Sequence, residues 1–186
     1  MSIVFLIKVD FLAIKKGFSM STLEQALKRS KKLFVDGIFF EQLRNLVQIV
    51  TDSKNSRCAE DLVVYYTRGL SNILTELGIQ TEIVENPIKN SPPFLIGSRM
   101  ESPEFKTILL YGHGDTVPLQ EGQWNEGIRP SDLKIIDDKI YGRGVADNKG
   151  QHLINLLALH SVLRTRTKLG FNLKIIFEMG EEIGSP

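Results

Sequence analysis

Two short apolar strands that flank an apolar helix constrain the fold of this chain more than any other feature. The strands are predicted at residues 106–111 and 171–177, and the helix between them at residues 151–164. Short apolar runs of this type belong in sheets that helices cover on both sides. Strand, helix and strand in that order predict a right-handed parallel crossover. We therefore expect an α/β fold with a mostly parallel central sheet.

The remaining elements are predicted from hydrophobic period and turn residues. Apolar positions three and four residues apart indicate amphipathic helices, whereas alternation and short apolar runs indicate strands. The predicted helices span residues 21–34, 39–50 and 60–77, the predicted strands span residues 81–85 and 94–96, and residues 134–136 and 139–141 form a predicted hairpin. Gly78 is placed to end the third helix.

Residues 1–19 are expected to form a leader outside the fold. Their apolar run, Ile3–Ile7, is interrupted by charged residues and is too short for a transmembrane helix, and it lacks the flanks of a secretory signal. Ser21 and Glu24 have the spacing of a helix capping box. We therefore expect residues 20–186 to form the folded part, and Met20 is an alternative start to Met1.

The composition excludes several classes of partner. Lys and Arg number 23 against 22 Asp and Glu, and a net charge of +1 gives no electrostatic reason for a nucleic-acid or membrane partner. The hydrophobic fraction of 42% is enough for a globular core. Because Cys58 is the only cysteine, neither an intrachain disulfide nor a thiolate zinc site can form. These features predict a soluble, cytoplasmic protein.

Polar residues of metal-binding type follow both apolar strands. His113 and Asp115 come after the first strand, Glu181 and Glu182 come after the second, and Asp147 lies in a glycine-rich loop between them. Ligands bind open parallel sheets at the carboxyl ends of their strands, where the loops converge. These three places are therefore predicted to meet in space.

Each of these residues also has a simpler interpretation. A histidine that ends an apolar strand is more often a hydrogen-bonded loop residue, and Asp147 alone could cap the following helix. Asp115 favours ligation by His113, because a metal-bound imidazole usually donates its other N–H to a nearby oxygen. The adjacent Glu181 and Glu182 would repel each other unless a cation or a shared proton is near, although an exposed acidic turn is the alternative. Oxygen and nitrogen ligands without cysteine suit zinc, manganese or cobalt.

Four further side chains are interpreted as lying outside this chemistry or as undecided. His152 and His160 fall on the helix after the loop, where a packing or polar-face role outweighs ligation. Trp124 could pack over the loop near the site, but an ordinary partly buried aromatic residue is the preferred interpretation. Arg143 could orient a carboxylate or pair with an aspartate in the hairpin turn, and the sequence leaves both options open.

Three motifs resemble the N-terminal signatures of the dinuclear zinc peptidases and deacylases. They are YGHGDTVP at residues 111–118, GRGVADNKG at residues 142–150 and GEEIGS at residues 180–185. That family includes acetylornithine deacetylase, succinyl-diaminopimelate desuccinylase, glutamate carboxypeptidase and carnosine dipeptidase. The resemblance covers roughly residues 34–186, and the second and third motifs are nearer to those of the dipeptidase branch.

The resemblance implies a role for each residue of the predicted site. His113 would bind one of two Zn²⁺ ions, Asp147 would bridge both, and Glu182 would bind the other. Asp115 would orient His113 or tune its basicity, and Glu181 would be the general base that takes a proton from the attacking water. Co²⁺ or Mn²⁺ could replace zinc.

The resemblance also implies a fold, a substrate class and an oligomeric state. The fold would be a three-layer zinc-exopeptidase-like catalytic domain, and the peptide bond between Asp147 and Asn148 would be cis. The substrate would be a small peptide or an N-acyl amino acid that carries a free carboxylate. Intact relatives are often homodimers.

The sequence departs from the family because it stops at Pro186, directly after the third motif. In the family a further acidic ligand, a lid and dimerisation domain, and a late histidine follow. We therefore expect residues 20–186 to be the N-terminal portion of a truncated catalytic domain. Two alternatives stay open: a non-catalytic remnant that binds metal weakly or associates with a complementary fragment, and an N-acyl amino-acid deacetylase.

The expected truncation predicts that the 186-residue chain binds zinc weakly and does not hydrolyse dipeptides. Each ion would keep two protein ligands, with Asp147 counted twice, whereas catalytic zinc normally has three and a water. Bound zinc and dipeptide turnover, measured on the purified chain, test this expectation. Stoichiometric dinuclear zinc together with turnover would overturn it.

Overall fold

The computed structural model describes residues 20–186, and the expected leader at residues 1–19 lies outside this range. The α-helices are α2 (Met20–Val35), α3 (Ile38–Gln48), α4 (Ala59–Val64), α5 (Ser71–Glu76) and α6 (Lys149–Arg166). The strands are β1 (Gln80–Val84), β2 (Phe94–Arg99), β3 (Thr107–His113), β4 (Lys134–Ile136), β5 (Lys139–Tyr141) and β6 (Asn172–Glu178). Short 3-10 turns are η2 (Ser56–Cys58), η4 (Glu121–Gln123) and η5 (Glu181–Ile183), and η3 (Tyr65–Leu70) is a π-helical turn. The predicted α/β class is confirmed.

The main sheet has four strands in the order β1-β2-β6-β3. β3 and β6 pair in parallel and are joined through α6, as the strand-helix-strand pattern predicts. β1 with β2 and β2 with β6 pair antiparallel, so the sheet is mixed in the described residues, where a mostly parallel sheet was predicted. β1 and β2 run antiparallel because a loop joins them without a crossover helix. β2 in turn pairs antiparallel with β6. The predicted hairpin β4–β5 forms a separate two-stranded sheet.

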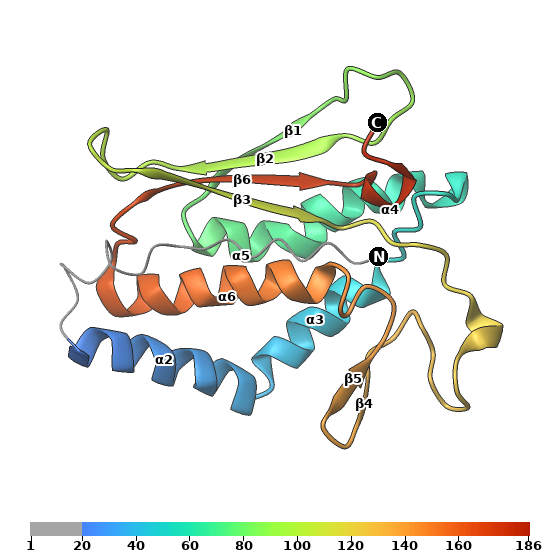
Figure 1. Cartoon of the computed structure of the whole chain (residues 1–186), viewed down its shortest axis with the longest axis horizontal. Coiled ribbons are helices and arrows are strands. Elements are labelled where there is room, and N and C mark those ends of the chain that lie inside the picture. The colour runs from blue at the N-terminus through green and yellow to red at the C-terminus, as the bar shows by residue number, and fades with distance from the viewer. Residues whose placement is uncertain (1–19) are drawn as a thin grey trace.

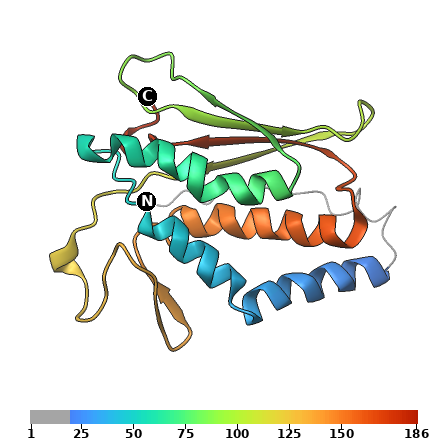
Figure 2. The same ribbon diagram turned by 180° about the vertical axis from the view of Figure 1, so that it is seen from behind.

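The helices cover one face of the main sheet. Figure 1 shows α4, α5 and α6 beneath the sheet, with α2 and α3 on the far side of α6, and Figure 2 shows the same arrangement from behind. The opposite face of the sheet carries Ile96, Leu109 and Tyr111, which are 40%, 53% and 50% exposed. Among residues 20–186 no helix covers this face, so the described part contains one side of the expected three-layer arrangement.

The core forms where the covered face of the sheet meets the helices. Leu95, Leu173, Ile175 and Phe177 point from the strands into this core and are at most 4% exposed. Leu156 of α6 is fully buried beneath them. Burial of these side chains fixes the register of the strands, because a one-residue slip would move all of them to the exposed face.

The helix predicted at residues 60–77 is interrupted by the π-helical turn η3, which the apolar period did not predict. Tyr65 and Tyr66 are adjacent in sequence, and both are buried, at 0% and 2% exposure. π turns inside α-helices are frequent at functional sites. Here the turn directs two neighbouring tyrosine side chains inward, and Tyr65 reaches the region beneath the carboxyl end of β3.

The first turn of α6 is fixed against the end of α3. The buried Lys149 Nζ donates to the carbonyl oxygens of Leu46 (3.0 Å) and Ile49 (2.8 Å). It also lies 5.0 Å from the centroid of the Tyr65 ring. Carbonyl groups at a helix C-terminus are unpaired and attract cations, so this lysine stabilises the end of α3.

At the other end of the described residues, α2 begins at Met20, so the backbone of Ser21 lies within the helix. Within residues 20–186, no helix has both the length and the apolar character needed to span a bilayer.

We expect Gly150→Ala to destabilise the fold by about 1–3 kcal/mol, the usual cost of overpacking. A Cβ at this position would lie 2.1 Å from the backbone oxygen of Val145, which cannot move without displacing the loop before α6. Urea unfolding measures the change. Gly122→Ala is the matched control because a Cβ there meets nothing within 4 Å, and equal effects of the two substitutions would contradict the prediction.

Candidate metal centre

The three motifs meet where β3 and β6 end. His113 is the last residue of β3 and pairs in register with Glu178, the last residue of β6. The chain then turns away from both strands, and the amide of Gly114 donates to the carbonyl of Glu178 (2.9 Å). Glu181 and Glu182 follow in the turn η5. Parallel pairing therefore brings together residues that lie nearly 70 positions apart in the sequence, as predicted.

His113 is buried and faces a carboxylate on each side of its ring. Its Nδ1 lies 3.3 Å from Asp115 Oδ1, and its Nε2 lies 3.1 Å from Asp147 Oδ1 and 3.9 Å from Glu181 Oε2. Burial lowers the pKa of His113, but the hydrogen bond and the negative charge of Asp115 outweigh this effect, and with Asp147 and Glu181 they raise it to about 9. In the absence of a cation the imidazole is therefore protonated at neutral pH.

Asp115 is fully buried and connects the first motif to the third. Besides facing His113, its carboxylate accepts hydrogen bonds from the backbone amides of Glu181 (3.3 Å) and Glu182 (3.1 Å). A buried carboxylate requires such partners because desolvation of an unpaired charge is very costly. Asp115 thus holds the ring of His113 and the turn η5 in a fixed relation.

The donor atoms present can hold a metal ion. One ligand atom from each of His113, Glu181 and Glu182 lies within 4.8 Å of the others. Asp147 adds a third carboxylate beside His113, and its side chain is 72% exposed. Burial and the negative charges of Asp147 and Glu181 raise the pKa of Glu182. This excess of negative charge is what a divalent cation would neutralise, and the imidazole and carboxylates form a donor set of the zinc, manganese or cobalt type.

The glycine-rich loop reaches this centre through a cis peptide bond between Asp147 and Asn148, as predicted. Asn148 Oδ1 accepts a hydrogen bond from the backbone amide of His113 (3.3 Å). The loop is therefore attached directly to the end of β3, which places the carboxylate of Asp147 next to the ring of His113.

The structure adds residues that the motifs did not indicate. Thr51 Oγ1 donates to the carbonyl of Gly114 (2.6 Å), and its own carbonyl accepts from the amide of Thr116 (2.9 Å). Tyr65 packs against Gly114, where an added Cβ would lie 2.5 Å from its ring. Thr51 follows a predicted helix and Tyr65 lies within one, and neither belongs to a metal-binding motif. The sequence signal that could have indicated these residues is the pair of glycines beside His113, since glycine allows other side chains to approach the backbone closely.

The two helix histidines, Trp124 and Arg143 have other partners than the predicted ligands. His152 is buried and hydrogen-bonded to Tyr65 (2.5 Å), while His160 lies 3.5 Å from Glu76. The guanidinium of Arg143 lies over the Trp124 ring, 5.4 Å from its centroid. Both side chains donate hydrogen bonds to the carbonyl of Leu119. In this structure Arg143 therefore contacts the loop and pairs with neither aspartate of the hairpin turn.

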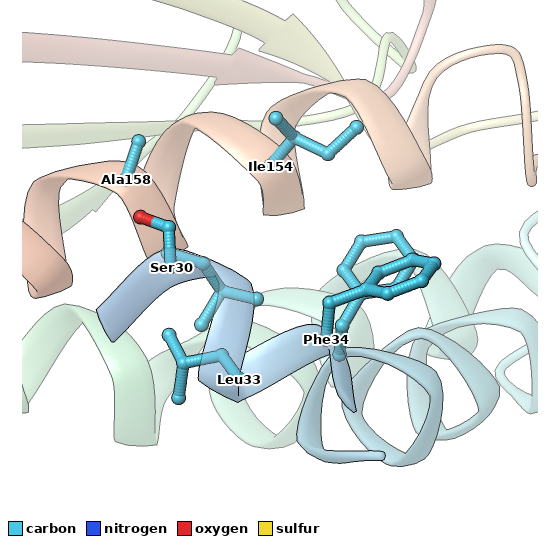
Figure 3. Close-up of a pocket in the computed structure, with 7 residues that line it drawn as sticks. Ser30, Leu33, Phe34, Ile154 and Ala158 are labelled. Atoms are coloured by element: carbon cyan, nitrogen blue, oxygen red, sulfur yellow. The ribbon is translucent and has the colours of Figure 1, made fainter. Parts of the chain in front are cut away.

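A separate apolar pocket lies between α2 and α6 and contains none of the predicted site residues. Figure 3 shows Ser30, Leu33 and Phe34 of α2 opposite Ile154 and Ala158 of α6. The serine hydroxyl is the only polar side-chain group in the lining, so the pocket offers no acid, base or metal ligand.

Comparison with known proteins finds a family model that matches the C-terminal part of this chain. Residues 109–186 match the model of peptidase family M20/M25/M40. This range contains all three motifs and every residue of the candidate metal centre, so the predicted family resemblance is confirmed.

Individual relatives are dipeptidases by name. Beta-Ala-His dipeptidase of Mus musculus is 38% identical over 95 residues, which cover 50% of this chain and 19% of that protein. Cys-Gly metallodipeptidase DUG1 of Saccharomyces cerevisiae is 30% identical over 159 residues, which cover 79% of this chain and 33% of that protein. The crystal structure of human carnosine dipeptidase 1 matches with a TM-score of 0.74 and 29% identity, covering 88% of this chain and 36% of that one. The chain therefore spans about a third or less of the length of these proteins.

We expect Asp115→Asn to lower the pKa of His113 from about 9 towards its usual value of 6.5. A raised pKa in the folded state means that the protonated ring stabilises the fold below pH 6.5, and that this stabilisation is lost as the pH rises through about 9. NMR titration of the ring in the metal-free chain measures the pKa. A pKa that stays near 9 in the variant would contradict the assigned role of Asp115.

Asp115→Asn should also reduce the free energy of unfolding by about 2 kcal/mol at pH 7, since it weakens hydrogen bonds to a buried charge. Asp138→Asn in the exposed β4–β5 turn is the matched control and should change neither the stability nor the pKa of His113.

Proposed function

We propose that this chain, whose residues 109–186 match the model of peptidase family M20/M25/M40, is part of a dinuclear zinc hydrolase that cleaves dipeptide-type bonds. The observation that carries the proposal is the convergence of His113 with the carboxylates of Asp147, Glu181 and Glu182 at the end of a parallel strand pair. The metallodipeptidase name of the yeast relative supports a metal cofactor.

His113, Asp147 and Glu182 are the proposed metal ligands, with Asp147 shared between two ions. The position of Asp147 supports this assignment, because its carboxylate lies beside the buried ring of His113 and is exposed, so a metal ion can reach it from the solvent. The raised pKa of Glu182 supports it as well, since a cation would relieve the repulsion from its neighbours. When bound, the ions would activate a water molecule and polarise the scissile carbonyl.

Glu181 is the proposed general base and Asp115 the group that orients His113. Glu181 is 45% exposed, so its carboxylate can reach both a water molecule and a substrate. It would accept a proton from the attacking water and return that proton to the leaving amine. Asp115 would keep Nδ1 of His113 protonated and leave Nε2 for the metal, which is the usual arrangement of a ligating histidine.

The proposed substrate is a small peptide with a free carboxylate. The names of the mouse, yeast and human relatives support a dipeptide. Arg143 is held by Trp124 and Leu119, so we do not assign it to the substrate carboxylate.

Metal affinity should rise with pH, because His113 with a pKa of about 9 must lose a proton when it becomes a ligand. For the 186-residue chain we expect the Kd for Co²⁺ to fall by about tenfold per pH unit between pH 7 and 8.5. Titration followed by visible absorption measures it. His113→Gln should remove this dependence, while His160→Gln, in the C-terminal half of α6 and beside Glu76, should keep it. A Kd that is independent of pH would contradict ligation by His113.

The assignments of Glu181 and Glu182 can be separated by their amide variants. Glu182→Gln should weaken Co²⁺ binding by about tenfold or more, since it removes a charged ligand, whereas Glu181→Gln should leave the Kd within about twofold. The two residues are adjacent and both bind Asp115 through their backbone amides, so each serves as the control for the other. The opposite order of effects would exchange their roles.

A further inference from the structure

A buried chain of hydrogen bonds runs from the π turn η3 to the candidate metal centre. Tyr65 and His152 are 0% and 1% exposed, and the Tyr65 hydroxyl lies 2.5 Å from His152 Nε2. His152 Nδ1 lies 3.2 Å from Asn148 Oδ1, the same atom that accepts the amide proton of His113. Neither Tyr65 nor His152 has a role in the chemistry proposed above.

The direction of every bond in this chain follows from one backbone amide. The amide of His113 can only donate, so the Asn148 atom that faces it must be the oxygen. His152 Nδ1 faces the same oxygen and must therefore carry a proton. Burial, with added repulsion from Lys149 and His113, lowers the pKa of His152 to about 3, so the ring is neutral and its Nε2 accepts from the Tyr65 hydroxyl.

The geometry around His113 matches this arrangement. A Cβ at Gly112 would lie 3.1 Å from both Asn148 Oδ1 and the Cβ of His152, and a Cβ at Gly114 would lie 2.5 Å from the ring of Tyr65. Because both neighbours of His113 are glycines, the hydrogen-bonded side chains can contact the backbone directly before and after this proposed ligand. The ring of His152 also packs 4.9 Å from that of Phe177, which limits its movement.

Side chains that only filled the core would not need the Tyr65 hydroxyl and the His152 imidazole. Burying a hydroxyl and an imidazole costs free energy unless both are hydrogen-bonded, and apolar side chains of similar size would fill the same space. Here the polar atoms are paired in one direction, and the chain ends on Asn148, which is joined to Asp147 and holds His113. The polar chain therefore fixes the separation of two proposed ligands that come from different motifs.

We propose that Tyr65 and His152 are positioning residues that hold Asn148 in place, and with it the backbone of His113 and the carboxylate of Asp147. This inference rests on the proposed function only for the role of the metal, since the hydrogen-bond chain exists in the metal-free protein. Figure 2 shows the elements it connects, with α4 and α5 lying beside α6 under the sheet.

The test compares Tyr65→Phe with Tyr66→Phe in the 186-residue chain. Both substitutions remove one buried hydroxyl from the same π turn, but Tyr66 donates to the carbonyl of Phe177 (2.8 Å) and not to His152. Loss of a partner behind the ligands typically weakens metal binding by 10- to 100-fold. We expect Tyr65→Phe to raise the Kd for Co²⁺ by about tenfold and Tyr66→Phe to change it by less than about twofold.

Two NMR measurements on the metal-free chain make the test independent of metal binding. Nitrogen-15 spectra should show His152 protonated at Nδ1 and not at Nε2. Hydrogen exchange of the His113 amide should become about tenfold faster in Tyr65→Phe and in His152→Leu, but not in Tyr66→Phe. Tyr65→Phe decides the comparison if His152→Leu does not fold.

The outcomes separate this inference from the proposed function. An Nε2-protonated His152, or equal effects of the Tyr65 and Tyr66 substitutions on Kd and exchange, would overturn the positioning role. If the unmodified chain binds no Co²⁺, the proposed function fails, and the ring protonation and amide exchange alone decide the inference.

Discussion

The buried carboxylate of Asp115 is the interaction on which the rest of the site depends. A charge with no exposure is tolerated only where donors surround it, and here they come from two distant parts of the chain. The imidazole of His113 is one donor, and the amides of Glu181 and Glu182 are the others. Because these donors follow β3 and β6, the carboxylate requires the two strands to end side by side and the turn η5 to fold back over them.

The second constraint is the close contact between the loop at Asn148 and the end of β3. Gly112 and Gly114 leave room for side chains from α6 and from the π turn η3 to touch the backbone on both sides of His113. Lys149 then fixes the same turn of α6 to the end of α3. Helices that are distant in sequence are therefore anchored around one histidine, so the packing of the core and the geometry of the site are determined together.

Much of this could be predicted from local patterns. The apolar strands at β3 and β6, the helix between them, the hairpin β4–β5 and the convergence of the three motifs were predicted, because each depends on short-range period or on the parallel crossover. The antiparallel insertion of β2 beside β6 was not predicted, because strand order depends on long-range pairing. The turn η3 was also missed, since one widened helical turn hardly alters the apolar period of its segment.

The sequence by itself determined the α/β class, the three motifs and the set of donor atoms, because those properties are carried by residue types and their spacing along the chain. The tertiary structure decided which partner each donor takes. His152 illustrates the difference: its place on a helix predicted a packing role, but only the fold put Tyr65 on one side of its ring and Asn148 on the other. The physical reason is that hydrogen bonds and desolvation act over a few ångströms, and distances of that size between remote segments exist only once the core has formed.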